Sequence, residues 1–154
     1  MNPALQSLLR EDLAAENAHD MAGTLATLHE DCLFEDMATG QVFRGHFGAE
    51  VYYRQWWDAL GLTFSRDRDD RGYWTEDGVY VTQGRFDGTH IGPFLGIPVT
   101  GKMASFRFAV FVTFRDGLIS GERFYYDLAG LFRQIGAAGW SLMPTSGAAG
   151  RSCR

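Results

Sequence analysis

The residue whose surroundings most favour chemistry is Asp127, which follows a strand-like aromatic run and precedes a short amphipathic helical segment. Strand alternation places Asp127 on one face with Tyr125, Arg123 and Ile119. A carboxylate enclosed by aromatic side chains has its ionised form disfavoured by desolvation. Asp127 is therefore a candidate general acid/base, with Tyr125 as a candidate substrate contact. Its position also allows Asp127 to cap the following helix, and the two roles are compatible.

Three other polar residues are candidates for the same site. Asp36 shares a strand face with Phe34, so both can enter a cavity, where two acids can divide the acid and base roles. Asp36 can equally be a turn residue. His90 can hydrogen-bond a substrate oxygen or Asp127, or it can be a loop histidine that bonds the backbone. Arg107 can bind an enolate oxygen or form an ion pair at the surface or an interface.

Aromatic residues recur at helical spacing within Gly48 to Leu60. Tyr52, Tyr53, Trp56 and Trp57 form a stripe broad enough to cover a sheet. We predict that they are core residues, and that one or two also line a cavity. Tyr53 and Trp56 are the candidates for contact with the substrate.

The sequence predicts no metal site. The four histidines have no close ligand spacing, and neither cysteine lies at a zinc-binding interval from the other: His19, His29, His46, His90, Cys32 and Cys153.

The elements that must position these residues begin with helices. Leucines at helical spacing predict a helix over Leu5 to Ala18, and Asp20 can cap a second helix that ends at Leu28. Strand patterns follow at Cys32 to Met37 and at Gln41 to Arg44. The third helix is Gly48 to Leu60.

Beyond this helix the apolar pattern changes to a period of two, which predicts strands at Leu62–Thr75, Val79–His90, Lys102–Arg115 and Leu118–Asp127. The strand Lys102–Arg115 carries Phe106, Phe108, Val110, Val112 and Phe114 on one face. Helices followed by a meander predict an α+β domain, in which three N-terminal helices pack on a strongly curved antiparallel sheet. Such a sheet leaves a cone-shaped gap beneath the helices.

The 154-residue chain is expected to form one domain over residues 1–136, followed by a mobile tail over residues 137–154 that is rich in Ala, Gly and Ser. A net charge of −5 argues against broad binding of nucleic acid. No apolar run approaches membrane-spanning length and no signal-peptide layout is present, so we expect a cytoplasmic protein without a membrane partner.

Four motifs together resemble those of the SnoaL-like polyketide cyclases, within the nuclear transport factor 2-like superfamily: Gly88-Thr89-His90, GPFLGIPVTGK from Gly92, RDGLIS from Arg115 and YYDLAGLFRQIG ending at Gly136. The resemblance implies a cone-like α+β barrel, no metal or organic cofactor, and association through the sheet. It also implies that Asp127 matches the family's general acid/base aspartate and that His90 matches the histidine of its Gly-Thr-His motif.

A narrower similarity concerns Arg85 and Asp87, which share one strand face. Together with Asp127 they are similar to the Arg-x-Asp and distant Asp of limonene-type epoxide hydrolases. This alternative requires the three side chains to converge on one water. Asp87 and Gly88 can also simply begin a turn.

The expected function is a cofactor-free ring closure or rearrangement of a small, hydrophobic, polyketide-like carbonyl compound. Asp127 would remove a proton, the enolate would close on a carbonyl group in an aldol step, and the new alkoxide would be protonated. Asp127→Asn is then predicted to abolish turnover and to preserve the fold. A non-catalytic binder of small hydrophobic ligands is the alternative from another class. We also expect a homodimer through the outer sheet face, because one face of the strand Lys102–Arg115 is almost wholly apolar.

Overall fold

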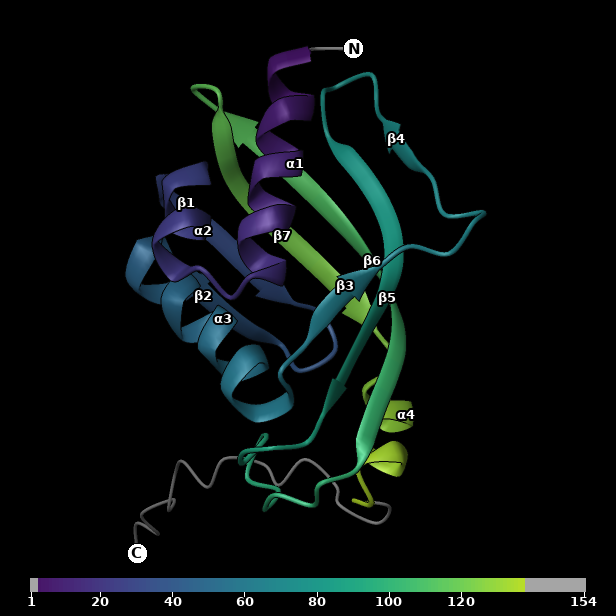
Figure 1. The fold of residues 1–154 in the computed structure, drawn as a ribbon. Coiled ribbons are helices and arrows are strands. Elements are labelled where there is room, and N and C mark those ends of the chain that lie inside the picture. The colour runs from purple at the N-terminus through teal and green to yellow at the C-terminus, as the bar shows by residue number, and fades with distance from the viewer. Residues whose placement is uncertain (1–2, 138–154) are drawn as a thin grey trace, which may run out of the picture.

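Three helices cover one side of a curved sheet in the computed structural model, which describes residues 3–137 (Figure 1). They are α1 (Pro3–Asn17), α2 (Met21–Thr27) and α3 (Gly45–Leu60). A fourth helix, α4 (Leu128–Gln134), follows the last strand. The predicted number and order of helices are confirmed. No helix among residues 3–137 is long and apolar enough to cross a membrane.

The sheet contains seven strands: β1 (Leu28–Asp36), β2 (Gln41–Arg44), β3 (Thr63–Ser65), β4 (Gly72–Trp74), β5 (Tyr80–Thr89), β6 (Met103–Arg115) and β7 (Leu118–Tyr126). Their order is β2-β1-β7-β6-β5-β3, and β4 pairs with a different stretch of β5, along the same edge as β3. The sheet is mixed and is not closed into a barrel. The prediction of a wholly antiparallel sheet is wrong at one place, because β1 and β7 run parallel. Between β1 and β7 the chain passes through α3 and then through the antiparallel strands β5 and β6. It enters β7 in the same direction as β1.

A bulge in β7 decides which of its side chains face the helices. Phe114 of β6 pairs with Ile119, but the preceding residue, Thr113, pairs with Gly121, so Ser120 is an extra residue in β7. An extra residue reverses the alternation of side chains along a strand. Ile119 is buried before the bulge, whereas Phe124 is buried after it, at a position of opposite parity.

Strand β6 carries the predicted apolar face toward the helices. Phe106, Phe108, Val110 and Val112 are all buried there. The apolar face that led us to expect a dimer is therefore the inner face of the sheet. The dimer itself stays a prediction.

Two aspartates begin helices as N-caps. The Asp20 carboxylate accepts a hydrogen bond from the Gly23 amide at the start of α2, at 3.0 Å. The Asp127 carboxylate does the same for the Gly130 amide at the start of α4, at 2.8 Å. Such caps satisfy amide groups that have no partner within the helix. Ala137 is buried, and the rest of the predicted tail, with Cys153, lies outside the described residues.

Candidate functional site

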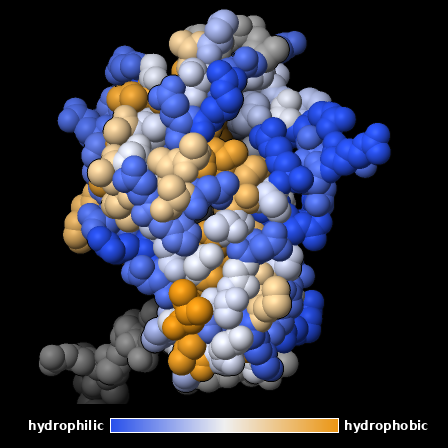
Figure 2. Space-filling view, in the orientation of Figure 1, coloured by the Kyte–Doolittle hydropathy of each residue, from blue (hydrophilic) through white to orange (hydrophobic). Residues whose placement is uncertain are grey.

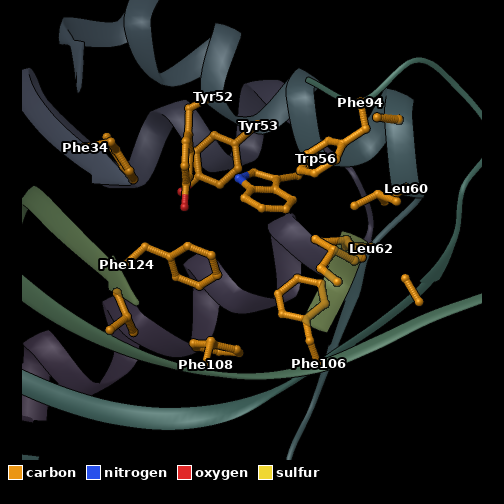
Figure 3. Close-up of a cluster of buried hydrophobic side chains, with 14 of the residues drawn as sticks. Phe34, Tyr52, Tyr53, Trp56, Leu60, Leu62, Phe94, Phe106, Phe108 and Phe124 are labelled. Carbon is orange, nitrogen blue, oxygen red and sulfur yellow. The ribbon is translucent and has the colours of Figure 1, made fainter. Parts of the chain in front are cut away.

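A cavity of about 750 Å³ lies between α1, α3 and the inner face of the sheet. Aromatic rings form much of its wall: Tyr52, Tyr53 and Trp56 of α3 face Phe108 of β6 and Phe124 of β7 across the interior (Figure 3). The Trp56 ring lies 5.7 Å from the Phe124 ring, between centroids, in an edge-on arrangement. Such a wall suits a flat, largely apolar ligand of drug-like size.

Three carboxyl groups interrupt this apolar lining. Asp12 and Glu16 lie one turn apart on α1, and Glu122 comes from β7 after the bulge. One carboxylate oxygen from each lies within 4.8 Å of the other two. Asp12 is buried, and the accessible surface that Glu16 and Glu122 keep faces the cavity.

Hydroxyl groups hold two of the three carboxyl groups in place. Thr27 Oγ1 donates to Asp12 Oδ1 at 2.6 Å, and Tyr53 OH donates to Glu16 Oε1 at 2.7 Å. Burial and the neighbouring Glu16 raise the pKa of Tyr53 well above its ordinary value, so its hydroxyl remains a donor. Among residues 3–137 no hydroxyl group donates a hydrogen bond to Glu122, so the three acids have different surroundings.

Burial raises the pKa of all three acids. Desolvation raises the pKa of Asp12 to about 6, although the Thr27 hydroxyl acts in the opposite direction. Burial and the charge of Asp12 raise the pKa of Glu122 to about 8. The pKa of Glu16 is also raised well above its ordinary value, by burial and by its acidic neighbours. At neutral pH the cluster therefore holds ionised and protonated carboxyl groups side by side.

This arrangement can both remove and deliver a proton within an aromatic cavity. Acids whose surroundings separate their pKa values can divide the base and acid roles. The three carboxylates are also the set among residues 3–137 that lies close enough together to hold a cation. A bound cation would keep them ionised and would compete with any acid role.

The structure does not place Asp127 in this cavity. Its side chain is 68% exposed, caps α4 and lies 3.6 Å from the Arg133 guanidinium. Tyr125 is on the outer sheet face, where its ring contacts that of Phe111. The expectation that aromatic side chains enclose Asp127 is therefore wrong, because the bulge at Ser120 turns this part of β7 outward. A catalytic role for Asp127 remains a prediction without geometric support.

Of the other residues that we predicted to face the cavity, some line it and others do not. Tyr53 and Trp56 line the cavity, as predicted. Asp36 and Phe34 are buried behind the wall: Asp36 accepts hydrogen bonds from Tyr126 OH and from the amides of a turn, and Phe34 packs on α3. His90 is also fully buried away from the cavity, with Nδ1 3.0 Å from the Thr100 hydroxyl.

Arg107, Arg85 and Asp87 lie on the outer face of the sheet. Arg107 pairs with Asp67 and Asp70, and Arg85 also pairs with Asp67. Asp87 accepts hydrogen bonds from the hydroxyls of Ser65 and Ser105. Epoxide opening would require Arg85, Asp87 and Asp127 to converge on one water. This is contradicted, because Arg85 and Asp87 alternate along β5 with Thr82 and Phe86, which face the cavity.

The three clustered acids were missed, although the sequence carries a signal for each. Asp12 and Glu16 continue the inward stripe of α1, at three and seven residues from Leu9. Glu122 has the same parity as Phe124 and Tyr126, so counting backward from those residues places it inward. Counting forward from Ile119, across the bulge, places it on the outer face.

The chain is similar to known proteins both in sequence and in fold. The family model described as SnoaL-like polyketide cyclase matches residues 6–135. The structure of TsrD from Streptomyces laurentii is 29% identical, with a TM-score of 0.74, over 89% of this chain and 98% of that one. A candidate SnoaL-like polyketide cyclase from Jannaschia sp. CCS1 has the same fold: 20% identity, TM-score 0.77, 89% of this chain and 96% of that one. No curated protein matches the chain.

Proposed function

Because the chain belongs to the SnoaL-like polyketide cyclase family, we propose that it is a cyclase or isomerase of polyketide-like carbonyl compounds that uses Asp12, Glu16 and Glu122 as its acid/base group. The observation that carries this proposal is the position of these carboxyl groups, which meet on the wall of an aromatic cavity. Their raised pKa values make one of them a base and another an acid at neutral pH.

Asp12 is the group best suited to act as the base. Its pKa, at about 6, is lower than that of Glu122, and the Thr27 hydroxyl stabilises its ionised form. In this account Asp12 removes a proton from a carbon atom next to a carbonyl group. The electron pair of that C–H bond moves onto the carbonyl oxygen and forms an enolate.

Glu122, which is protonated at neutral pH, is suited to stabilise that enolate oxygen through its O–H group. The enolate carbon then forms a bond to a second carbonyl carbon in the same molecule. The second oxygen becomes an alkoxide and takes a proton from the cluster, so that no atom is gained or lost. The aromatic wall holds the substrate folded, so that the two reacting carbons meet.

A carbon acid that fits an aromatic cavity tests this proposal without knowledge of the natural substrate. We would measure the uptake of deuterium by 2-tetralone at its acidic CH₂ position in D₂O, by NMR. The protein should accelerate this exchange, and Glu122→Gln should lower the acceleration by about 10²-fold or more, because general acid/base groups typically contribute 10²–10⁴ in rate.

The matched control is Glu35→Gln. Glu35 lies on β1, outside the cavity lining, and pairs with Arg123. This variant should exchange 2-tetralone at the wild-type rate. A folded wild-type protein that gave no acceleration would contradict the proposed chemistry and would favour a ligand-binding function.

A further inference from the structure

The cavity has a cationic side that the proposed chemistry does not use. Arg66, which follows β3, and Arg10, on α1, both line the cavity and are both exposed. The space-filling view shows apolar surface between α1 and the strongly hydrophilic residues near β4 (Figure 2). Because both arginine side chains line the cavity and are exposed, they lie where the cavity opens to water.

The segment that joins β3 to β4 divides its charges between the two faces of the sheet. Two of its acids, Asp67 and Asp70, pair with Arg85 and Arg107 on the outer face. One of its arginines, Arg66, turns to the inner face instead and lines the cavity. Asp67, which follows Arg66 directly in the chain, and the buried Asp70 are therefore already paired with other arginines.

Neutral groups hold the Arg66 guanidinium in position. Its Nη2 donates to Tyr80 OH and to Thr82 Oγ1, both at 3.3 Å, and the guanidinium carbon lies 5.7 Å from the centre of the Phe64 ring. Within residues 3–137, no carboxylate lies within ion-pair distance of Arg66. Its Nη1 and Nε groups have no hydrogen-bond acceptor in that part of the chain. A fixed guanidinium with free donors is well suited to bind a carboxylate.

The carboxyl cluster, in contrast to Arg66, disfavours a negatively charged group beside it in the same cavity. An anionic group placed beside Asp12, Glu16 and Glu122 would be repelled by any ionised member of the cluster. The same group placed at Arg66 would be attracted. This separation of charge gives a substrate that carries one negative group a single favoured orientation.

We infer that the substrate is a polyketide-like acid, whose carboxylate is bound by Arg66 at the cavity opening while its reactive carbonyl carbons lie at the carboxyl cluster. Arg10 adds a second positive charge at the opening. This inference rests on the proposed function in one respect, namely that the substrate reacts at the carboxyl cluster. The binding of the acid group can be measured without any turnover.

The test compares two probes of nearly the same shape, the anionic 2-naphthoate and the neutral 2-naphthamide, by isothermal titration calorimetry at low salt. The wild-type protein should bind the acid about tenfold more tightly than the amide, which is the scale expected for charge-assisted hydrogen bonds. Arg66→Gln should remove this preference and leave the affinity for the amide nearly unchanged.

Arg68→Gln is the matched control. Arg68 is an exposed arginine of the same segment that does not line the cavity, so its loss should keep the preference for the acid. Equal affinity of wild-type protein for the two probes, no binding of the acid, or an equal loss in both variants would overturn the inference.

Glu122→Gln separates this inference from the proposed function. If that variant exchanges 2-tetralone normally and still prefers the acid, the proposed chemistry fails and the anion site stands. If the acid preference is absent while 2-tetralone exchange depends on Glu122, the anion site fails and the proposed chemistry stands.

Discussion

Asp12→Asn should stabilise the protein, by an amount that grows with pH. Burial raises the pKa of Asp12 from its ordinary value of 3.8 to about 6 in the folded protein. Between these two values the folded state binds the proton more tightly than the unfolded state does. The free energy of unfolding of the wild type therefore falls as pH rises through this range.

The size of the effect follows from the same pKa values. A rise from 3.8 to about 6 corresponds to about 3 kcal/mol, at about 1.4 kcal/mol for each pH unit. Asparagine does not titrate, and its side-chain oxygen can still accept the hydrogen bond that Thr27 donates to Asp12. The stability difference between Asp12→Asn and wild type should thus increase by about 3 kcal/mol between pH 4 and pH 7.

The measurement is urea denaturation of both proteins at several pH values between 4 and 8. For a domain of this size, the full difference in the free energy of unfolding would correspond to a shift of about 6–12 °C in Tm. Asp127→Asn is the matched control, because it makes the same chemical change at a helix cap that is exposed to solvent. A difference between Asp12→Asn and wild type that is constant with pH, or that changes sign toward destabilisation, would refute the burial of Asp12 among acids.

Three further predictions concern the rate, the backbone and the assembly. The exchange rate of 2-tetralone should follow a bell-shaped pH profile, rising as Asp12 ionises near pH 6 and falling as Glu122 loses its proton near pH 8; a flat profile over pH 5–9 would contradict the assigned roles. Gly88→Ala should lower the free energy of unfolding by at least about 2 kcal/mol, because the added Cβ would lie 2.1 Å from the Leu60 carbonyl oxygen; a denaturation midpoint equal to that of wild type would show that β5 shifts freely. Light scattering at micromolar concentration should give the mass of a dimer, and a monomer would count against association through the outer sheet face, where Phe111 and Tyr125 are partly exposed.

The fold could be predicted from the sequence because its signals are local. The helical stripes of α1 and α3 and the alternation along β6 each depend on residues close together in the chain. The parallel pairing of β1 with β7 could not be read in this way, because it joins segments about 90 residues apart, as the hydrogen bond from Tyr126 to Asp36 illustrates.

The site was harder to predict because a single extra residue changes which side chains meet. With Ser120 accommodated as a bulge, Glu122 faces the cavity and the strand residues after it alternate accordingly. Without the bulge, Tyr125 and Asp127 would take the inner face, as the sequence pattern led us to expect. The apolar neighbours of Asp127 contribute to this error, because they belong to α4 and not to a cavity wall.

The acids of α1 illustrate a second difficulty. Asp12 and Glu16 occupy inward positions of an otherwise leucine-rich stripe, but a polar residue at the edge of such a stripe commonly faces solvent. Only the approach of Glu122, from the opposite end of the chain, makes them a cluster. The aromatic wall could be predicted because Tyr53 and Trp56 lie in one helical stripe.

The most direct test of the account compares Asp12→Asn with Asp127→Asn in the 2-tetralone exchange assay. Asp12 lies in the aromatic cavity, and Asp127 is the aspartate that the sequence motif favours. Asp12→Asn should lower the exchange rate by about 10²-fold or more, whereas Asp127→Asn should exchange at the wild-type rate. Loss of exchange in folded Asp127→Asn, with normal exchange in Asp12→Asn, would contradict the central claim and return the acid/base role to Asp127.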